Sequence, residues 1–462
     1  MGRKHGRRMF LKFLNTHKNG RTRTQTRCFE EDRRRCSQAE MIERRLSDAW
    51  ENINSKENVN FHRAIRWTLC IMTILSVFPV NGIMSKSASG LSYSRKSFRF
   101  IISLIVVLFG FLELILTIRL AIKLGFDIKS ISNIVSWMTS LYAAIALRRL
   151  AKSWPRLMQN FSVKEEIFLK YPYMPPKWSI TISMTFLAIF MFLMVTVERV
   201  LFYTKVVYES NVNYNFCNAT VPFAEHFFKR QRPHFFDLID YHPWLQPIIE
   251  WAHFSMNSCW AFVDVIIINI SIALTARFNQ LNERIISEYQ RTMNPDQWSQ
   301  LRGHYQILAD LVAEVDLYVS NLILISCGNN LYFISYYIFK SFTMFHDSYR
   351  PDMTYRIHLW FSISLLIVRA ASVLLIASNI NDASRKSVNT IRRLPTKFWN
   401  IEVQRFVDEI EMRKVALTGK NIFKLTRKLI LAFSGTIVTF EIALLDRVRY
   451  DESKRLKCEI AF

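Results

Sequence analysis

The chain has 462 residues, 50% of them hydrophobic, and a formal net charge of +24. A chain of this length and hydrophobicity can build one membrane domain with modest polar segments, which excludes a large separate soluble catalytic module. The basic excess lies beside long apolar runs and therefore indicates membrane orientation rather than nucleic-acid binding.

The first sixty residues form a polar tail rich in Lys and Arg. Among the first 36 residues, 12 are basic, against the three acids Glu30, Glu31 and Asp32. Such a composition is typical of a disordered segment that faces anionic lipid from the cytosol. No cleavable signal peptide is expected before the first apolar stretch. We predict a basic, disordered cytosolic tail over residues 1–60.

A short apolar stretch, Trp67 to Val80, precedes the long ones. Its core of about 14 residues is cut by Pro79, which suits a re-entrant or interfacial segment over residues 61–97 better than a span. This assignment leaves the basic residues near the first two spans in the cytosol, as the positive-inside tendency requires. They are Lys86, Arg95, Lys96, Arg99, Arg148, Arg149, Lys152 and Arg156.

Seven long apolar runs follow, close to or above the roughly 17–25 residues that a membrane helix needs. Because lipid offers backbone polar groups no partner, runs of this length must be helices. We predict an all-α membrane protein with helices 1–4 in 98–276, helices 5 and 6 in 317–381 and helix 7 in 425–446. The runs are Phe100–Leu120, Ile131–Leu147, Ile180–Val207, Ile248–Leu274, Leu317–Phe339, Ile357–Ile380 and Leu425–Leu445.

The loop over residues 208–247 lies on the extracellular side in this topology. It contains the sequon Asn218-Ala219-Thr220, which is usable only on the lumenal side of the secretory pathway. Such triplets also arise by chance, and Asn160-Phe161-Ser162 is a cytosolic example that would stay unused. We predict a glycoprotein of the plasma membrane with a cytosolic amino terminus and an extracellular tail at 447–462.

Two long polar connections, residues 277–316 and 382–424, lie on the cytosolic side. Their apolar residues recur at steps of three and four, which is typical of amphipathic helices. We predict helical extensions of the membrane helices that pack together as an anchor. Helices lying on the membrane surface are the alternative.

Four ionisable residues lie inside the spans, where each indicates a functional site because charges at bilayer depth are costly. They are Glu113, Glu198, Asp264 and Arg369. An internal ion pair between Arg369 and Glu113 is the structural alternative.

The fourth span has a polar stripe. His253, Asn257, Trp260 and Asp264 follow at steps of four, three and four and share one helical face. Carboxylates and amides bind hydroxyl groups, and aromatic rings cover C–H faces, so this mixture suits a small polyol or sugar. Hydrogen bonding between helices without a ligand is the alternative. The predicted ligand-binding residues are Glu198, His253, Asn257, Trp260, Asp264, Asn329, Asn330, Tyr336, His358 and Trp360.

No catalytic motif competes with this interpretation. HExxH, GxSxG, P-loop and GxGxxG patterns are missing from suitable contexts. The seven cysteines are scattered without CxxC pairs, which indicates neither a zinc site nor a disulfide framework. We predict no enzyme activity, no cofactor and no metal.

Three strings carry a resemblance to a known family: 315–333 (VDLYVSNLILISCGNNLYF), 381–385 (NDASR) and 415–420 (VALTGK). Each resembles the matching stretch of the insect gustatory receptors of the sugar branch, and the resemblance runs from about His62 to Leu445. It implies a sugar-gated, non-selective cation channel with a ligand pocket open to the outside. It also implies assembly as a homo- or heterotetramer with other gustatory receptor subunits.

The resemblance further implies that the last span lines a shared pore. The family ends in Thr-Tyr, five mostly apolar residues and Gln-Phe, whereas this chain has Thr439-Phe440 and ends the motif with Asp446-Arg447. Either the outer mouth of the pore is unusual or the final coding segment has been mis-assembled. The predicted pore-lining residues are Thr436, Thr439, Phe440, Ala443, Leu444 and Asp446.

Two other classes remain as alternatives. A seven-helix receptor coupled to G proteins lacks its DRY and NPxxY signatures here and has the opposite polarity. A secondary transporter would need a repeated pair of broken helices, and no such pair is visible.

Overall fold

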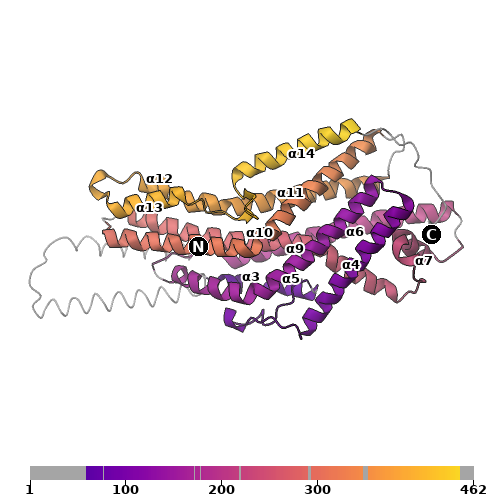
Figure 1. Ribbon diagram of the computed structural model, residues 1–462, viewed down its shortest axis with the longest axis horizontal. Helices are drawn as coiled ribbons and strands as arrows, with labels where there is room; N and C mark the ends of the chain where they lie inside the picture. The colour runs from indigo at the N-terminus through magenta and orange to yellow at the C-terminus, as the bar shows by residue number, and fades with distance from the viewer. Residues whose placement is uncertain are drawn as a thin grey trace, which may run out of the picture. The chain divides into compact units, whose positions relative to one another are not determined.

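The computed structural model describes residues 59–75, 77–170, 172–176, 178–217, 220–289, 293–346 and 352–447 (Figure 1). Within these ranges, side chains are not described at 288–289, 343–346 and 443–447. The chain divides into two compact units, Met1–Ile53 and Asn54–Phe462, and every described residue belongs to the second. The predicted basic tail lies almost wholly outside the described residues, as do Asn218 and the tail beyond Arg447.

Helices make up nearly all the regular structure in these ranges. The α-helices are α3 (Phe61–Ile74), α4 (Phe98–Leu124), α5 (Ile128–Leu169), α6 (Ile180–Phe216), α7 (Phe223–Gln231), α8 (Pro233–Phe236), α9 (Leu245–Tyr289), α10 (Pro295–His346), α11 (Met353–Arg385), α12 (Val388–Ile391), α13 (Ile401–Met412) and α14 (Arg427–Arg447). Two short 3₁₀ helices are η1 (Ala88–Gly90) and η2 (Thr396–Phe398), and the strands β1 (Thr418–Gly419) and β2 (Phe423–Lys424) pair antiparallel.

Five of the helices are long and apolar enough to cross a membrane: α4, α5, α6, α9 and α11. They contain the predicted spans one to four and six, so the chain is a multi-pass helical membrane protein. The predicted fifth and seventh spans lie within α10 and α14. That these two helices also cross the bilayer, giving seven spans, stays a prediction.

The turn between α4 and α5 shows how the sequence sets helix ends. α4 stops before Gly125, whose φ of 95° is accessible to glycine at little cost. Two residues later, the Asp127 carboxylate accepts a hydrogen bond of 2.6 Å from the Ser130 amide and caps α5. The chain can therefore reverse in three residues and place α5 against α4.

The helix α9 lies at the centre of the bundle, because it contacts α4, α5, α6, α10 and α11. Its membrane segment is 78% buried, against 28% for that of α6. On α6, by contrast, Ile182, Phe186 and Leu193 are exposed as lipid-facing residues would be. Polar side chains on α9 consequently meet other helices rather than lipid.

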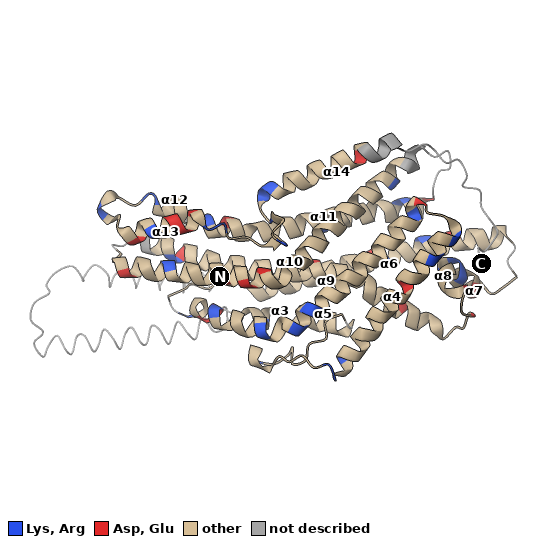
Figure 2. Ribbon diagram, in the orientation of Figure 1, with Lys and Arg blue, Asp and Glu red and all other residues tan. Residues whose placement is uncertain are grey.

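The long helices α5, α9 and α10 continue beyond their apolar segments and pack together, and α10 also packs on α13. Tyr305 of α10 contacts the rings of Phe278 on α9 and Phe406 on α13, at 5.9 and 5.7 Å between centroids. Glu165 and Arg277 form a fully buried ion pair of 2.6 Å between α5 and α9. Figure 2 shows that acidic and basic residues alternate along the ribbon around α12 and α13. The second predicted anchor, residues 382–424, contains the end of α11, then α12, η2, α13 and the hairpin β1–β2.

The short helix α3 and the loop after it form a hairpin that turns within the bundle. α3 begins beside the Glu165 carboxylate, which accepts from the Phe61 amide at 2.9 Å, and further along Thr68 meets Asn269 of α9. The chain then returns, because Arg66 donates to the Met84 carbonyl at 3.3 Å. The two ends of the hairpin therefore lie close together, and that this segment is re-entrant in the membrane stays a prediction.

The hairpin β1–β2 joins the anchor to α14. Asp316 of α10 accepts two hydrogen bonds of 2.6 Å from Thr418, one from the amide and one from the hydroxyl. Lys420 and Asn421 make the turn with φ of 54° and 59°, in the left-handed region that non-glycine residues rarely adopt. The Thr418 hydroxyl also accepts from the Asn421 amide, which helps to hold this conformation.

The helix α14 packs on α10 and α11 along one narrow stripe (Figure 1). Phe433 and Ile437 contact the bundle, whereas the predicted pore residues Thr436, Thr439 and Phe440 are exposed. The side chains of the other three predicted pore residues, Ala443, Leu444 and Asp446, lie outside the described side chains. Among the described residues, α14 therefore presents a free face where the pore was predicted.

Candidate ligand-binding site

Two fully buried charges of the membrane bundle form an ion pair between α9 and α11. Arg369 donates to Asp264 Oδ2 from Nη2 at 2.5 Å and from Nε at 3.1 Å, and both residues are fully buried. The Ser326 hydroxyl of α10 donates to the other carboxylate oxygen, Oδ1. Groups from three helices thus contribute to one ion pair. A buried ion pair is tolerated when its geometry is good and further hydrogen bonds satisfy its remaining polar atoms.

Trp260 covers the cationic side of this pair. The Arg369 guanidinium carbon lies 3.5 Å from the centroid of the Trp260 ring, a cation–π contact. Trp260 and Asp264 are one helical turn apart on α9, which is why both reach the same arginine. Two of the four residues of the predicted α9 stripe therefore contact the same arginine.

A small cavity borders the ion pair. Its volume is about 10 Å³, room for about one water molecule, and far below the roughly 300–1,000 Å³ of typical ligand pockets. Four helices, α5, α9, α10 and α11, supply its walls. They are Thr139, Ala143, Trp260, Val263, Asp264, Ile325, Ser326, Asn329 and Arg369.

Three buried polar atoms in this part of the bundle make no hydrogen bond to any described residue, and two of them belong to residues that line the cavity, Asn329 and Arg369. The three atoms are one donor, Arg369 Nη1, and two acceptors, Asn329 Oδ1 and Asn330 Oδ1. The amide nitrogen of Asn330 donates to the Ser326 hydroxyl at 3.4 Å, so its side chain is held toward the ion pair. Buried polar groups are costly without partners, and the residues that line the cavity carry one such donor, on Arg369, and one such acceptor, on Asn329.

A second group of predicted residues lies between α6 and α11. Glu198 Oε1 is 3.3 Å from His358 Nε2, and the Ser362 hydroxyl donates to the same oxygen at 3.4 Å. The ring of Phe202 packs on His358 with 5.7 Å between centroids. Glu198 and His358 therefore come together in a group separate from Asp264.

The remaining predicted ligand residues are distributed over the bundle. His253 and Asn257 bond each other at 2.7 Å, and the Trp137 ring packs on His253. Tyr336 stacks parallel to Tyr332, at 6.4 Å between ring centroids. Trp360 is 46% exposed and belongs to none of these groups, so its role in binding stays a prediction.

Glu113, the fourth ionisable residue, does not pair with Arg369, whose carboxylate partner is Asp264. His234 Nε2 of α8 lies 2.7 Å from Glu113 Oε2, and Arg232 approaches Glu113 Oε1 at 3.8 Å. Arg232 also donates to Glu250 of α9 at 2.7 Å. This cluster fastens the predicted extracellular loop to α4 and α9, and it has the character of a structural lock rather than of a ligand pocket.

Sequence reasoning omitted Ser326 and Arg369 from the predicted ligand set and gave no role to Arg232, His234 or Glu250. Ser326, Asn329 and Asn330 follow at steps of three and one, and that spacing on α10 was the available signal for Ser326. No spacing rule connects Asp264 to Arg369, which are 105 residues apart. No group of three or more metal-ligating side chains occurs in the described part of the chain.

Comparison with known proteins agrees with this architecture. A sequence model described as trehalose receptor matches residues 32–458. The chain is 31% identical over 387 residues to gustatory receptor for sugar taste 64b of Drosophila melanogaster, covering 84% of this chain and 94% of the relative. It is 28% identical over 396 residues to gustatory receptor 5a for trehalose of the same species, covering 86% of each chain. These relatives are receptors, not enzymes.

The fold is also similar to that of a solved receptor. The insect olfactory receptor OR5 from Machilis hrabei, in complex with eugenol, superposes with a TM-score of 0.54 at 11% identity. The match covers 84% of this chain and 100% of the olfactory receptor. At this identity the likeness establishes the shared helical architecture.

Proposed function

This chain belongs to the sugar branch of the insect gustatory receptors, and on that premise we propose that it binds a sugar beside Asp264 and Arg369 and opens a cation channel in response. The relatives are named for sugar taste and for trehalose. The sugar reaches the site from the extracellular side of the plasma membrane.

The observation that carries the binding site is the pair of unpartnered polar atoms on two cavity-lining residues, Arg369 and Asn329, beside Trp260. A sugar hydroxyl both donates and accepts, so one polyol satisfies the Arg369 donor and the Asn329 acceptor together. The Trp260 ring supplies an apolar face for the C–H side of a sugar ring. An apolar odorant would leave both atoms unsatisfied.

The small volume of the cavity makes binding and conformational change inseparable. Space for about one water cannot hold a sugar, so helices must move apart or side chains must rearrange before a sugar fits. A sugar that binds only the expanded state shifts the equilibrium toward that state. The Asp264–Arg369 pair then holds the contracted state, and sugar hydroxyls replace part of its contacts in the expanded one.

The two helices that supply Asn329 and Arg369 also hold the start of α14. On α10, Asp316 binds Thr418 of the hairpin before α14. On α11, Asp382 pairs with Arg427, the first residue of α14, at 2.5 Å. A shift of α10 or α11 at the cavity therefore acts directly on the base of the proposed pore helix.

The proposed topology places the amino terminus in the cytosol and the carboxyl terminus outside. The α3 hairpin supports it, because the two hairpin ends lie close together. Cys217, at the end of α6, is disulfide-bonded, a bond typical of oxidising extracellular compartments. Sequence spacing had not indicated this disulfide.

The free face of α14 supports a pore shared between subunits. Thr436, Thr439 and Phe440 are exposed in the single chain, and a homo- or heterotetramer would turn such faces toward a common axis. Apolar side chains brought together there close a pathway by dewetting, and outward motion rehydrates it.

The test is a matched pair of substitutions on α10. Asn329→Leu removes an acceptor that bonds no described residue, so folding should persist while half-maximal sugar concentration rises about three- to tenfold, the value of one hydrogen bond. Ser335→Ala is the control, because Ser335 is also buried and unpartnered among the described residues but does not line the cavity.

Both variants would be expressed in cells with trehalose, sucrose, maltose and glucose as probes, and currents measured against sugar concentration. Equal responses of Asn329→Leu and wild type, with normal surface expression, would contradict the proposed site. A response to none of these sugars by wild type, alone or with other gustatory receptor subunits, would contradict the proposed function.

A further inference from the structure

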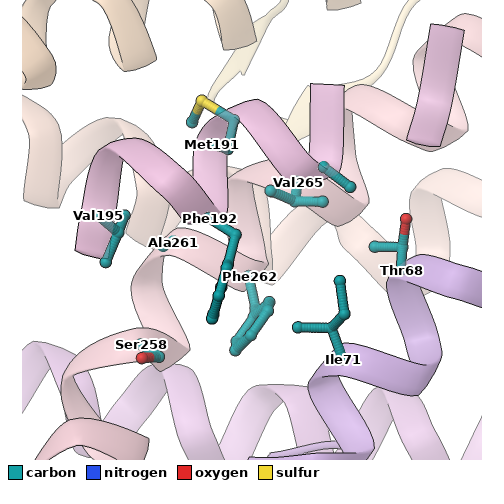
Figure 3. Close-up of a pocket in the computed structure, with 10 residues that line it drawn as sticks. Thr68, Ile71, Met191, Phe192, Val195, Ser258, Ala261, Phe262 and Val265 are labelled. Carbon is teal, nitrogen blue, oxygen red and sulfur yellow. The ribbon is translucent and has the colours of Figure 1, made fainter. Parts of the chain in front are cut away.

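A second cavity lies on the opposite side of α9 from the ion pair. Figure 3 shows side chains from α3, α6 and α9 converging on it, with Phe192 and Phe262 pointing into the space between Ser258 and Ile71. Its volume is about 20 Å³. The walls are Thr68, Ile71, Ala188, Met191, Phe192, Val195, Ser258, Ala261, Phe262 and Val265, which we call the α3–α6–α9 crevice.

The crevice offers a ligand almost only hydrocarbon. Its two hydroxyl groups already have partners: Ser258 donates to the Phe254 carbonyl at 2.8 Å, and Thr68 accepts from Asn269 at 3.2 Å. The other walls are aliphatic, aromatic or thioether groups. Apolar cavities of this kind exclude water and accept apolar molecules. A sugar would lose its hydrogen bonds here, so the crevice does not belong to the proposed sugar site.

The crevice opens toward the bilayer. It lies between α6 and α9, two of the helices long and apolar enough to span a membrane. Phe192, at its mouth, is 37% exposed, and Ile189 and Leu193, which are on α6 but do not line the crevice, are 55% and 53% exposed. The apolar material that meets this surface in a membrane is the acyl chain of a lipid.

We propose that the α3–α6–α9 crevice binds the end of a fatty acyl chain that enters sideways from a bilayer phospholipid. The crevice shares one short stretch of α9 with the polar cavity. Ala261, Phe262 and Val265 face the crevice, whereas Trp260 and Asp264 face the cavity. A bound chain end therefore contacts the reverse side of the helix segment that carries the ion pair.

Photo-crosslinking tests the proposal without reference to sugar responses. The full chain would be reconstituted in phosphatidylcholine vesicles that contain a phospholipid with a diazirine near the end of one acyl chain, illuminated, and mapped by peptide mass spectrometry. We expect labelling of Phe262 and Val265, which lie inside the crevice and are 6% and 4% exposed.

Two variants move the labelling in opposite directions. Ala188→Leu fills the crevice and should reduce labelling of Phe262 about tenfold, the loss expected when one or two methylenes no longer find a buried site. Phe192→Ala widens the mouth and should increase it. Ile189→Phe is the matched control, because this neighbour is exposed and does not line the crevice; it should leave labelling of Phe262 unchanged.

The proposal is overturned if Phe262 and Val265 stay unlabelled while exposed residues such as Ile182 are labelled. It is also overturned if Ala188→Leu, like the control Ile189→Phe, leaves the labelling of Phe262 at the wild-type level. A parallel arm with a free diazirine fatty acid distinguishes the source of the chain. Labelling by the free acid but not by the phospholipid would refute a phospholipid chain as the occupant.

Discussion

Removing the charge of Asp264 should damage the fold more than it damages ligand binding. Asp264 and Arg369 are both fully buried, and the pair is held by two Arg369 donors and the Ser326 hydroxyl. Breaking a buried pair by removing one partner costs about 3–5 kcal/mol, because the other charge stays buried and unpaired. A lost contact to a sugar hydroxyl costs only about 1–3 kcal/mol. Asp264→Asn should therefore lower surface expression and thermal stability, and this effect should exceed its effect on sugar binding.

Replacing both partners separates the structural role from the binding role. An apolar pair of similar volume in place of a buried ion pair is often neutral or stabilising. Asp264→Leu/Arg369→Met should thus recover much of the stability lost in Asp264→Asn, while its sugar response stays absent because the proposed donor at Arg369 is gone. Fluorescence-detected size-exclusion melting and surface biotinylation measure stability, and currents measure the response.

An exposed ion pair provides the control. Glu166 and Lys170 on α5 are bonded at 2.6 Å with side chains 59% and 63% exposed, so Glu166→Gln should leave the melting temperature unchanged. If Asp264→Asn melts like wild type, the buried-pair reasoning is wrong. If the double variant responds to sugar like wild type, the ion pair is not part of the binding site.

Two further predictions concern the anchor and the pore. Burial, with the nearby positive charge of Arg284, lowers the pKa of His304 below 6.5, so the folded state resists protonation of this ring. The free energy of unfolding should therefore fall as the pH drops through 6.5. His304→Gln should weaken this pH dependence in melting curves taken across that range. A wild-type curve as flat as that of the variant would exclude His304 as the cause. Cysteines at Thr436 and Thr439 should react with external thiol reagents when sugar opens the channel, whereas a cysteine at Ile437, on the packed stripe, should not. Equal reactivity at all three positions would remove α14 from the ion pathway.

Local sequence patterns determine the helices and their caps. Apolar runs long enough to span a bilayer predict helices because lipid leaves the backbone no other partner, and α4, α5, α6, α9 and α11 follow from that constraint. The Asp127 cap and the Gly125 turn are likewise readable from neighbouring residues. The shared face of Trp260 and Asp264 follows from helical spacing alone.

Which charges meet was decided only by the tertiary structure. Glu113 and Asp264 are both carboxylates in apolar spans, yet Asp264 pairs with Arg369 whereas Glu113 pairs with His234. Spacing rules reach one or two helical turns, whereas these partners are 105 and 121 residues apart. The same limit applies to Glu198, which the sequence grouped with Asp264 and packing places with His358. The sequence by itself therefore determined which polar residues share a helical face, because that depends only on neighbours a few positions apart. The packing of α9 against the surrounding helices decided which of these residues form one site.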